Sequence, residues 1–289
     1  MKNDFFNIVN IFRFISRFLK FCSRQLNKCS DFISQYLNYD KYDPKLDKNK
    51  YVSLSYNRAI TELFWRKKKF KKLMDKTLKE NGIEIKHSFL IKTHREREWE
   101  FYTTFYSADL KNTDIVLDTG AYNTYFCVFL KGYVKKIYST DNFYWAGRDS
   151  IKKLNLPSPE QWMAEINRVE PDKLTAQKAD LMNLPFENNK FDKIFCISVI
   201  EHLKDDLRGM EEMFRTLKPG GILLLTTEVN KRLNKPYSET DETYYRIYGY
   251  EQIMNLIKEA GFKLAGKNKV IETIDRDGEF CQALFVLTK

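Results

Sequence analysis

From about residue 114 onward, short apolar runs alternate with longer amphipathic stretches. The apolar runs predict seven strands, over residues 115–117, 136–139, 174–178, 194–198, 222–227, 270–274 and 283–287. The amphipathic stretches predict helices over residues 124–130, 160–169, 205–217 and 250–260. Strands that alternate with helices of this length are typical of an α/β fold, with a mostly parallel sheet covered by helices on both faces. Because only a short link joins the last two runs, we expect the last strand to be antiparallel.

The first forty residues have the pattern of a basic amphipathic helix. Its cations gather on one side, and they are Lys2, Arg13, Arg17, Lys20, Arg24 and Lys28. Phenylalanine, isoleucine and leucine cover most of the opposite side. Such a helix either packs on the rest of the protein or lies at a membrane interface, and the breadth of its apolar face favours the interface.

A linker and a second helical pattern follow. Residues 38–50 lack periodicity and contain Pro44, which is typical of a linker. Residues 59–78 have helical spacing and include a basic run at 66–72, which is either a solvated helix face or a phosphate-binding surface. We therefore expect three parts: a basic amphipathic helix over residues 1–40, a linker and helical extension over 41–94, and a main domain over 95–289.

Composition narrows the class of protein. The 289 residues are 43% hydrophobic, which suffices for a full core. Residues 1–100 hold 23 Lys and Arg against 12 Asp and Glu, whereas the remaining 26 and 27 nearly balance. A basic first third is expected to meet an anionic lipid surface or a nucleic-acid backbone. The five cysteines have no metal-ligand spacing, which favours a reducing cytoplasmic compartment and no metal site. We expect neither a membrane-spanning segment nor a cleaved export signal.

The predicted strands end in residues that suit a nucleotide-like ligand. In an open α/β sheet, ligands bind outside the carboxyl ends of the strands. The first strand ends at Asp118, with Gly120 allowing close approach of the backbone to a ligand. The second ends at Asp141, 23 residues later, a spacing that suits a carboxylate bonded to ribose hydroxyls. The third leads to Asp180 and Leu181, a polar and an apolar side chain for the edge and face of an adenine.

Two further segments complete a recognisable order. The fourth strand leads into residues 198–203 (SVIEHL), and the Lys-Pro-Gly-Gly turn at 218–221 precedes the fifth. Together, the five features make the sequence similar to the Rossmann-like class I S-adenosylmethionine-dependent methyltransferases, closest to the type 11 methyltransferase domain, over residues 95–289.

The resemblance implies S-adenosylmethionine as the cofactor and a role for each strand end. Asp118 and Gly120 would lie against its amino-acid end, and Asp141 would hold the ribose. Asp180 and Leu181 would meet the adenine. Ser198 would line the floor near the sulfonium.

The glycine motif departs from the family pattern, because Tyr122 and Thr124 stand where the family usually has its second and third glycines. Tyr122 is compatible with cofactor binding only if its φ is negative and its ring points away from the ligand. The alternative is a catalytically inactive scaffold.

His202 is the candidate base for a hydroxyl acceptor, and packing against the nearby helix is the equally plain alternative. The segment after the fourth strand lacks the Asn/Asp-Pro-Pro-aromatic motif of nucleic-acid amino-methyltransferases. It also lacks the Pro-Cys pair that would supply the nucleophilic cysteine of a cytosine C5 methyltransferase. We therefore predict a cytoplasmic methyltransferase that acts on a small molecule or on a glycan or lipid-linked precursor, in peripheral contact with the inner face of the membrane. The phenylalanine content of the N-terminal helix argues against nucleic acid, and an RNA-binding methyltransferase is the further alternative.

Overall fold

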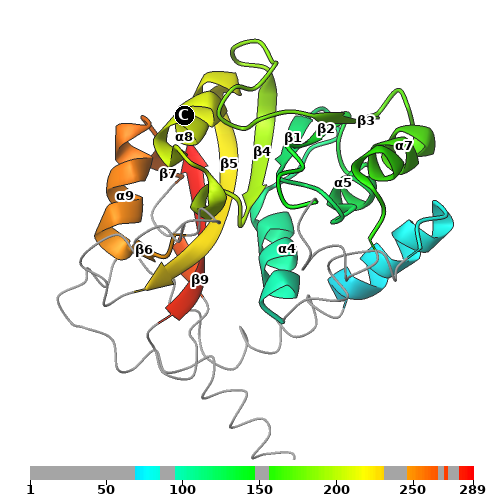
Figure 1. Cartoon of the computed structure of the whole chain (residues 1–289), viewed down its shortest axis with the longest axis horizontal. Helices are drawn as coiled ribbons and strands as arrows, with labels where there is room; N and C mark the ends of the chain where they lie inside the picture. The colour runs from blue at the N-terminus through cyan, green and yellow to red at the C-terminus, as the bar shows by residue number, and fades with distance from the viewer. Residues whose placement is uncertain (1–68, 85–94, 147–155, 231–245, 266–269, 273–279) are drawn as a thin grey trace, which may run out of the picture.

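A computed structural model describes residues 69–84, 95–146, 156–230, 246–265, 270–272 and 280–289, which form one mixed sheet with helices on both faces (Figure 1). The strands are β1 (Ile115–Thr119), β2 (Lys136–Asp141), β3 (Leu174–Lys178), β4 (Phe191–Ile197), β5 (Leu217–Asn230), β6 (Tyr248–Gly249), β7 (Lys263–Leu264), β8 (Val270–Glu272) and β9 (Phe280–Thr288). The predicted N-terminal amphipathic helix and linker lie outside the described residues.

The order of the strands is β3-β2-β1-β4-β5-β9-β7, with β6 paired to β5 and β8 to β9. The strands β1 to β5 run parallel, whereas β9 is antiparallel to β5. The chain builds outward from β1 in one direction and from β4 in the other. The strand order therefore reverses between β1 and β4, where a ligand is expected in such a sheet. The predicted α/β class, the parallel sheet and the antiparallel last strand are confirmed.

Helices cover the two faces of the sheet over separate cores. They include α4 (Arg95–Ser107), α5 (Phe126–Leu130), α7 (Pro159–Val169), η4 (Ile200–His202), α8 (Asp206–Thr216) and α9 (Tyr250–Glu259). One core packs α4, α5, α7 and residues 70–83 against the sheet, and the other lies beneath α8 and α9. Because both faces are covered, five consecutive residues of β4 from Lys193 to Ile197 are buried.

Local sequence explains where several helices begin. Ser158 accepts a hydrogen bond from the Gln161 N–H and starts α7 in a capping box. Asp205 caps α8 by accepting a hydrogen bond from the Arg208 N–H. The predicted helix at 124–130 begins only at Phe126, because Tyr125 has a left-handed backbone with φ 50°.

Some elements differ from the prediction. The sheet contains the two-residue strands β6 and β7 in addition to the seven expected strands. The sequence pattern did not predict α4, whose charged and aromatic residues have weak helical periodicity. A helix covers residues 69–80 and continues past the stretch predicted to end at 78. Within the described parts of the chain, no helix is long and apolar enough to cross a membrane.

Candidate active site

The turn after β1 requires a glycine for two reasons. Gly120 has φ +65°, a left-handed conformation that disfavours a side chain. A Cβ atom at this position would also lie 2.3 Å from Cγ2 of Val199, in the segment after β4. The glycine therefore brings the turn after β1 into close contact with the segment that precedes η4.

Asp118 is a buried acid at the carboxyl end of β1, with 3% of its surface exposed. Desolvation by burial, helped by the charge of Asp141, raises the pKa of Asp118 from 3.8 to about 8. Within the described part of the structure, its Oδ2 atom has no hydrogen-bond partner. A buried acid with an unused oxygen suits a polar ligand group, and a cation bound beside it would favour its ionised form.

Asp141 joins the ends of β1 and β2. Its Oδ2 accepts the Tyr122 N–H at 3.1 Å, and its Oδ1 accepts the Phe143 N–H at 2.6 Å. Burial raises the pKa of Asp141, while these two hydrogen bonds act in the opposite direction. Each carboxylate oxygen has two lone pairs, so both retain capacity for a ligand hydroxyl.

The ring of Tyr122 is held in an aromatic cluster. Its centroid lies 5.4 Å from that of Phe143 and 5.9 Å from that of Trp162. The hydroxyl donates to the carbonyl oxygen of Pro157 at 2.5 Å. Since the φ of Tyr122 is not positive, the backbone condition set by the sequence is satisfied.

Asp180 and Leu181 follow β3. The Asp180 Oδ1 accepts the Met182 N–H at 2.9 Å and shapes the turn, while Leu181 is buried at 4% exposure in the core with α8. The Ala179 N–H donates to the Asp141 carbonyl, which joins the end of β3 to that of β2. The end of β3, where the adenine is expected, is therefore hydrogen-bonded to the end of β2, where the ribose is expected.

Ser198 is held by a residue that the sequence analysis did not single out. Its hydroxyl donates to Oε1 of Glu100 on α4 at 2.6 Å. The Thr226 hydroxyl donates to the same oxygen at 2.7 Å. Glu100 has no exposed surface, and Arg97 lies on its other oxygen at 3.2 Å. The only signal in the sequence was an acidic residue between Trp99 and Phe101.

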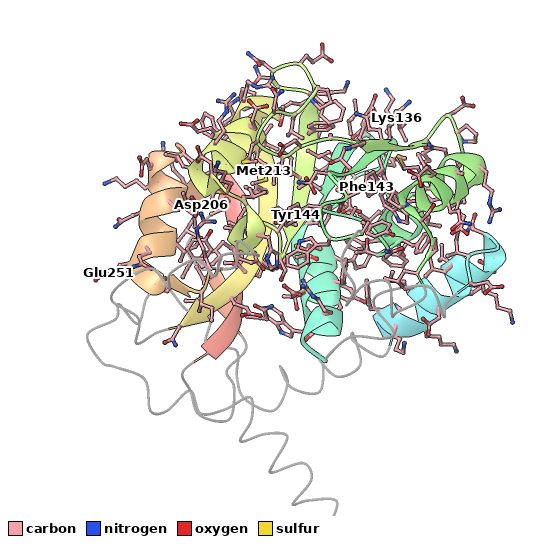
Figure 2. All side chains as sticks on the ribbon, viewed as in Figure 1. Lys136, Phe143, Tyr144, Asp206, Met213 and Glu251 are labelled. Atoms are coloured by element: carbon pink, nitrogen blue, oxygen red, sulfur yellow. The ribbon has the colours of Figure 1, made fainter. Side chains whose placement is uncertain are left out.

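His202 lies in η4, which follows β4, the strand next to β1 in the sheet. Its ring packs edge to face against Trp145, with centroids 4.8 Å apart. Trp145 belongs to the loop after β2, and Figure 2 shows its neighbours Phe143 and Tyr144 near the carboxyl ends of the central strands. Because β1 lies between β2 and β4, the contact between Trp145 and His202 spans the carboxyl end of β1.

Glu201 adds a second buried acid beside His202. It is 1% exposed and accepts the Thr227 hydroxyl at 3.1 Å. Burial raises the pKa of Glu201 from 4.5 to about 8, and the charge of Arg97 works against this rise. A raised carboxyl pKa beside a strand end is a frequent property of functional sites.

The structure thus brings most of the predicted residues to one edge of the sheet. Asp118, Gly120, Tyr122, Asp141 and Ser198 lie at or just beyond the carboxyl ends of β1, β2 and β4, and Asp180 and Leu181 follow β3. The sequence analysis missed Glu100, Arg97 and Trp145 as members of this edge.

Parts of the chain are similar in sequence to known methyltransferases. A sterol 24-C-methyltransferase of Pneumocystis carinii is 43% identical over 82 residues, covering 28% of this chain and 21% of the relative. A demethylmenaquinone methyltransferase of Lactiplantibacillus plantarum is 26% identical over 117 residues, covering 32% and 49%. The chain spans at most about half the length of these curated relatives.

A solved structure shares the fold. It is the 1,6-didemethyltoxoflavin-N1-methyltransferase of Burkholderia thailandensis with bound 1,6-didemethyltoxoflavin and S-adenosylhomocysteine, at TM-score 0.54 and 11% identity, covering 82% of this chain and 92% of that one. The family described as "Methyltransferase domain" matches residues 91–266, more than half of the chain. The chain therefore belongs to this methyltransferase family and has its Rossmann-like fold.

Proposed function

We propose that this protein is an S-adenosylmethionine-dependent methyltransferase that acts on a small-molecule acceptor. The observation that carries the proposal is Asp141, whose two oxygens each accept one backbone N–H, from Tyr122 after β1 and from Phe143 after β2, and so retain capacity for further hydrogen bonds. Two hydroxyls of a ribose match two such oxygens. Family membership supports the same cofactor.

Other residues of this edge fit the remaining parts of the cofactor. The unused Oδ2 of the buried Asp118 suits the ammonium of the amino-acid end. Gly120, with its positive φ, shapes the turn after β1 that would lie against the amino-acid end, while Val199 fills the space where a Cβ would stand. The hydrogen bond from the Ala179 N–H to the Asp141 carbonyl brings the turn that holds Asp180 and Leu181 next to the ribose residue, where these two would meet the adenine. The residues present therefore fit the group that the family implies.

The chain's own contribution to catalysis is orientation and proton removal. When bound, the cofactor supplies a methyl group on a sulfonium; a nucleophile attacks the methyl carbon in line, and S-adenosylhomocysteine leaves. His202 would accept the proton of a hydroxyl acceptor, since it stands on η4 beside the cofactor edge. Trp145 limits the positions of the imidazole through its ring contact.

The relatives support a small-molecule acceptor. Their names specify a sterol, demethylmenaquinone and 1,6-didemethyltoxoflavin. The basic amphipathic pattern of residues 1–40 adds a finer proposal, that the acceptor is a glycan or lipid-linked precursor met at the cytoplasmic face of a membrane.

Calorimetric titration with S-adenosylhomocysteine tests the cofactor part. We expect saturable binding by the wild-type protein, and Asp141→Ala should weaken it by about tenfold or more through loss of charge-assisted hydrogen bonds. The melting temperature of the variant controls for folding. A folded wild-type protein that binds no S-adenosylhomocysteine would instead support the inactive scaffold.

Vesicle co-sedimentation tests the membrane part with the full chain. Anionic vesicles should carry the wild-type protein to the pellet at low salt and release part of it at high salt. Reversing four cationic residues, Arg13, Arg17, Lys20 and Arg24, to Glu should leave the protein in the supernatant. Wild-type protein that stays in the supernatant at low salt contradicts the membrane proposal but not the methyltransferase proposal.

A further inference from the structure

A single buried carboxylate connects α4 to three strands. Oε1 of Glu100 accepts the hydroxyls of Ser198 and Thr226 at 2.6 and 2.7 Å, and the Gln282 amide lies at 3.3 Å from the same oxygen. These donors come from the end of β4, from β5 and from β9. Figure 1 shows α4 beside the carboxyl end of β4, and α4 also contacts β5 and β9.

The second oxygen of Glu100 has a different partner. Oε2 lies 3.2 Å from Nη1 of Arg97, which stands one turn earlier on α4. The side chain of Arg97 is 26% exposed. The charge of Arg97 also acts on the buried Glu201 carboxyl and favours its ionised form. Oε1 of Glu100 therefore holds residues of the strands, while Oε2 holds Arg97, whose charge acts on Glu201 of η4.

Ser198 is the point at which this arrangement reaches the cofactor edge. Its φ is +50°, which is uncommon for a residue with a side chain. Its N–H bonds to the Thr226 carbonyl and hydroxyl, both at 3.1 Å. The next residue is Val199, whose side chain occupies the space where Gly120 lacks a Cβ. A shift of Ser198 would therefore move Val199 against the turn after β1.

We propose that Glu100 is a positioning residue: by holding Ser198 through one oxygen and Arg97 through the other, it fixes the shape of the cofactor site from a helix outside the strands. This inference rests on the proposed function, because it concerns the affinity of that same site. In this role Glu100 would act through its contacts with Ser198 and Arg97, and through Val199 next to Ser198.

A plain stabilising role for Glu100 makes a different prediction. A buried, hydrogen-bonded carboxylate contributes to stability wherever it lies. Glu212 on α8 provides the matched control, since it is 2% exposed and pairs with an arginine three residues away, Arg215, at 2.7 Å. The substitution Glu→Gln can be made at both positions. It keeps one carbonyl oxygen and replaces the other by an amide NH₂, which cannot accept from a guanidinium.

The experiment measures S-adenosylhomocysteine affinity by calorimetry and melting temperature for the wild-type protein, Glu100→Gln and Glu212→Gln. We expect Glu100→Gln to weaken binding by about tenfold or more, the scale of a charge-assisted contact, and Glu212→Gln to leave affinity within about twofold although it lowers the melting temperature. A Glu100→Gln variant that melts earlier and binds like the wild type would overturn the proposal.

A milder variant covers the case in which Glu100→Gln does not fold. Ser198→Ala removes only the hydroxyl that Glu100 holds, and we expect it to weaken binding by about threefold or more at a near-normal melting temperature. Unchanged affinity in Ser198→Ala would overturn the inference. Absence of binding by the wild-type protein would instead refute the proposed function, so the two failures are distinguishable.

Discussion

The indole ring of Trp145 lies edge to face against the imidazole of His202, with ring centroids 4.8 Å apart and an interplanar angle of 76°. The two residues come from the loop after β2 and from η4 after β4, and they meet across the carboxyl end of β1. The proposed base is thereby oriented by the same loop that begins at the proposed ribose residue, Asp141.

Replacing His202 by Gln should separate catalysis from cofactor binding. Gln retains hydrogen-bonding groups but is no base, so turnover on a hydroxyl acceptor should fall by about a hundredfold while S-adenosylhomocysteine affinity stays unchanged. Steady-state methyl transfer and calorimetry on the same preparation measure both. Normal turnover in His202→Gln would leave this histidine with a structural role only.

Trp145 should influence turnover through the orientation of His202. Trp145→Phe keeps an aromatic ring against the imidazole, whereas Trp145→Ala removes it. We expect a loss of up to about tenfold in turnover for the alanine variant, the scale of one aromatic pair, and a smaller loss for the phenylalanine variant. Equal rates in the two variants would show that the ring contact does not matter to the reaction.

Gly120 and Val199 should be energetically coupled. Gly120→Ala introduces a Cβ at φ +65° and 2.3 Å from Cγ2 of Val199, so we expect it to lower the free energy of unfolding by about 2 kcal/mol or more. Val199→Ala in the same chain should recover part of that loss by removing the steric clash. Urea denaturation of the two single variants and the double variant gives the coupling energy. Strict additivity would contradict the close approach.

The ring of Tyr122 should matter more to stability than to cofactor binding. Tyr122→Phe loses the hydrogen bond to Pro157, at a cost of about 1 kcal/mol in the free energy of unfolding. Tyr122→Gly also loses the contacts with Phe143 and Trp162, so a loss of about 3 kcal/mol is expected. Denaturation together with calorimetry tests this. Weaker S-adenosylhomocysteine binding by a fully folded Tyr122→Phe variant would indicate that the hydroxyl acts in the site.

Stability should fall as the pH rises toward 8. The folded pKa values of Asp118 and Glu201 are both about 8, above their ordinary values of 3.8 and 4.5. Between the ordinary and the folded pKa values, the folded state keeps protons on Asp118 and Glu201 that the unfolded chain has released. The contribution of these two protons to the free energy of unfolding is therefore fully present below about pH 4 and is lost as the pH rises through 8. Urea denaturation from pH 5 to 8 should show this slope.

Asp118→Asn supplies the control for this pH dependence, since its amide resembles the protonated acid and does not titrate. We expect the variant to gain stability relative to the wild type as the pH increases from 5 to 8. Parallel curves for the two proteins over this range would contradict the raised pKa of Asp118.

The sequence predicted the sheet because each central strand is an apolar run bounded by turn residues, and it predicted the candidate ligand residues because they stand at strand ends. Asp118, Asp141 and Asp180 could be located from strand order alone. Glu100 could not, since α4 mixes charged and aromatic residues without a clear apolar stripe and its partner Ser198 lies 98 positions away. The contact between Trp145 and His202 likewise depends on how two loops meet in space.

The central claim is that Asp141 binds the ribose of S-adenosylmethionine at the carboxyl ends of β1 and β2. A thermodynamic cycle tests it most directly, with calorimetric affinities of wild-type protein and Asp141→Ala for S-adenosylhomocysteine and for its 2′-deoxy analogue. We predict that the wild type binds the deoxy analogue about tenfold more weakly, and that Asp141→Ala binds both compounds equally, because the hydroxyl has lost its acceptor. A folded Asp141→Ala variant that discriminates between the two compounds as strongly as the wild type would contradict the account.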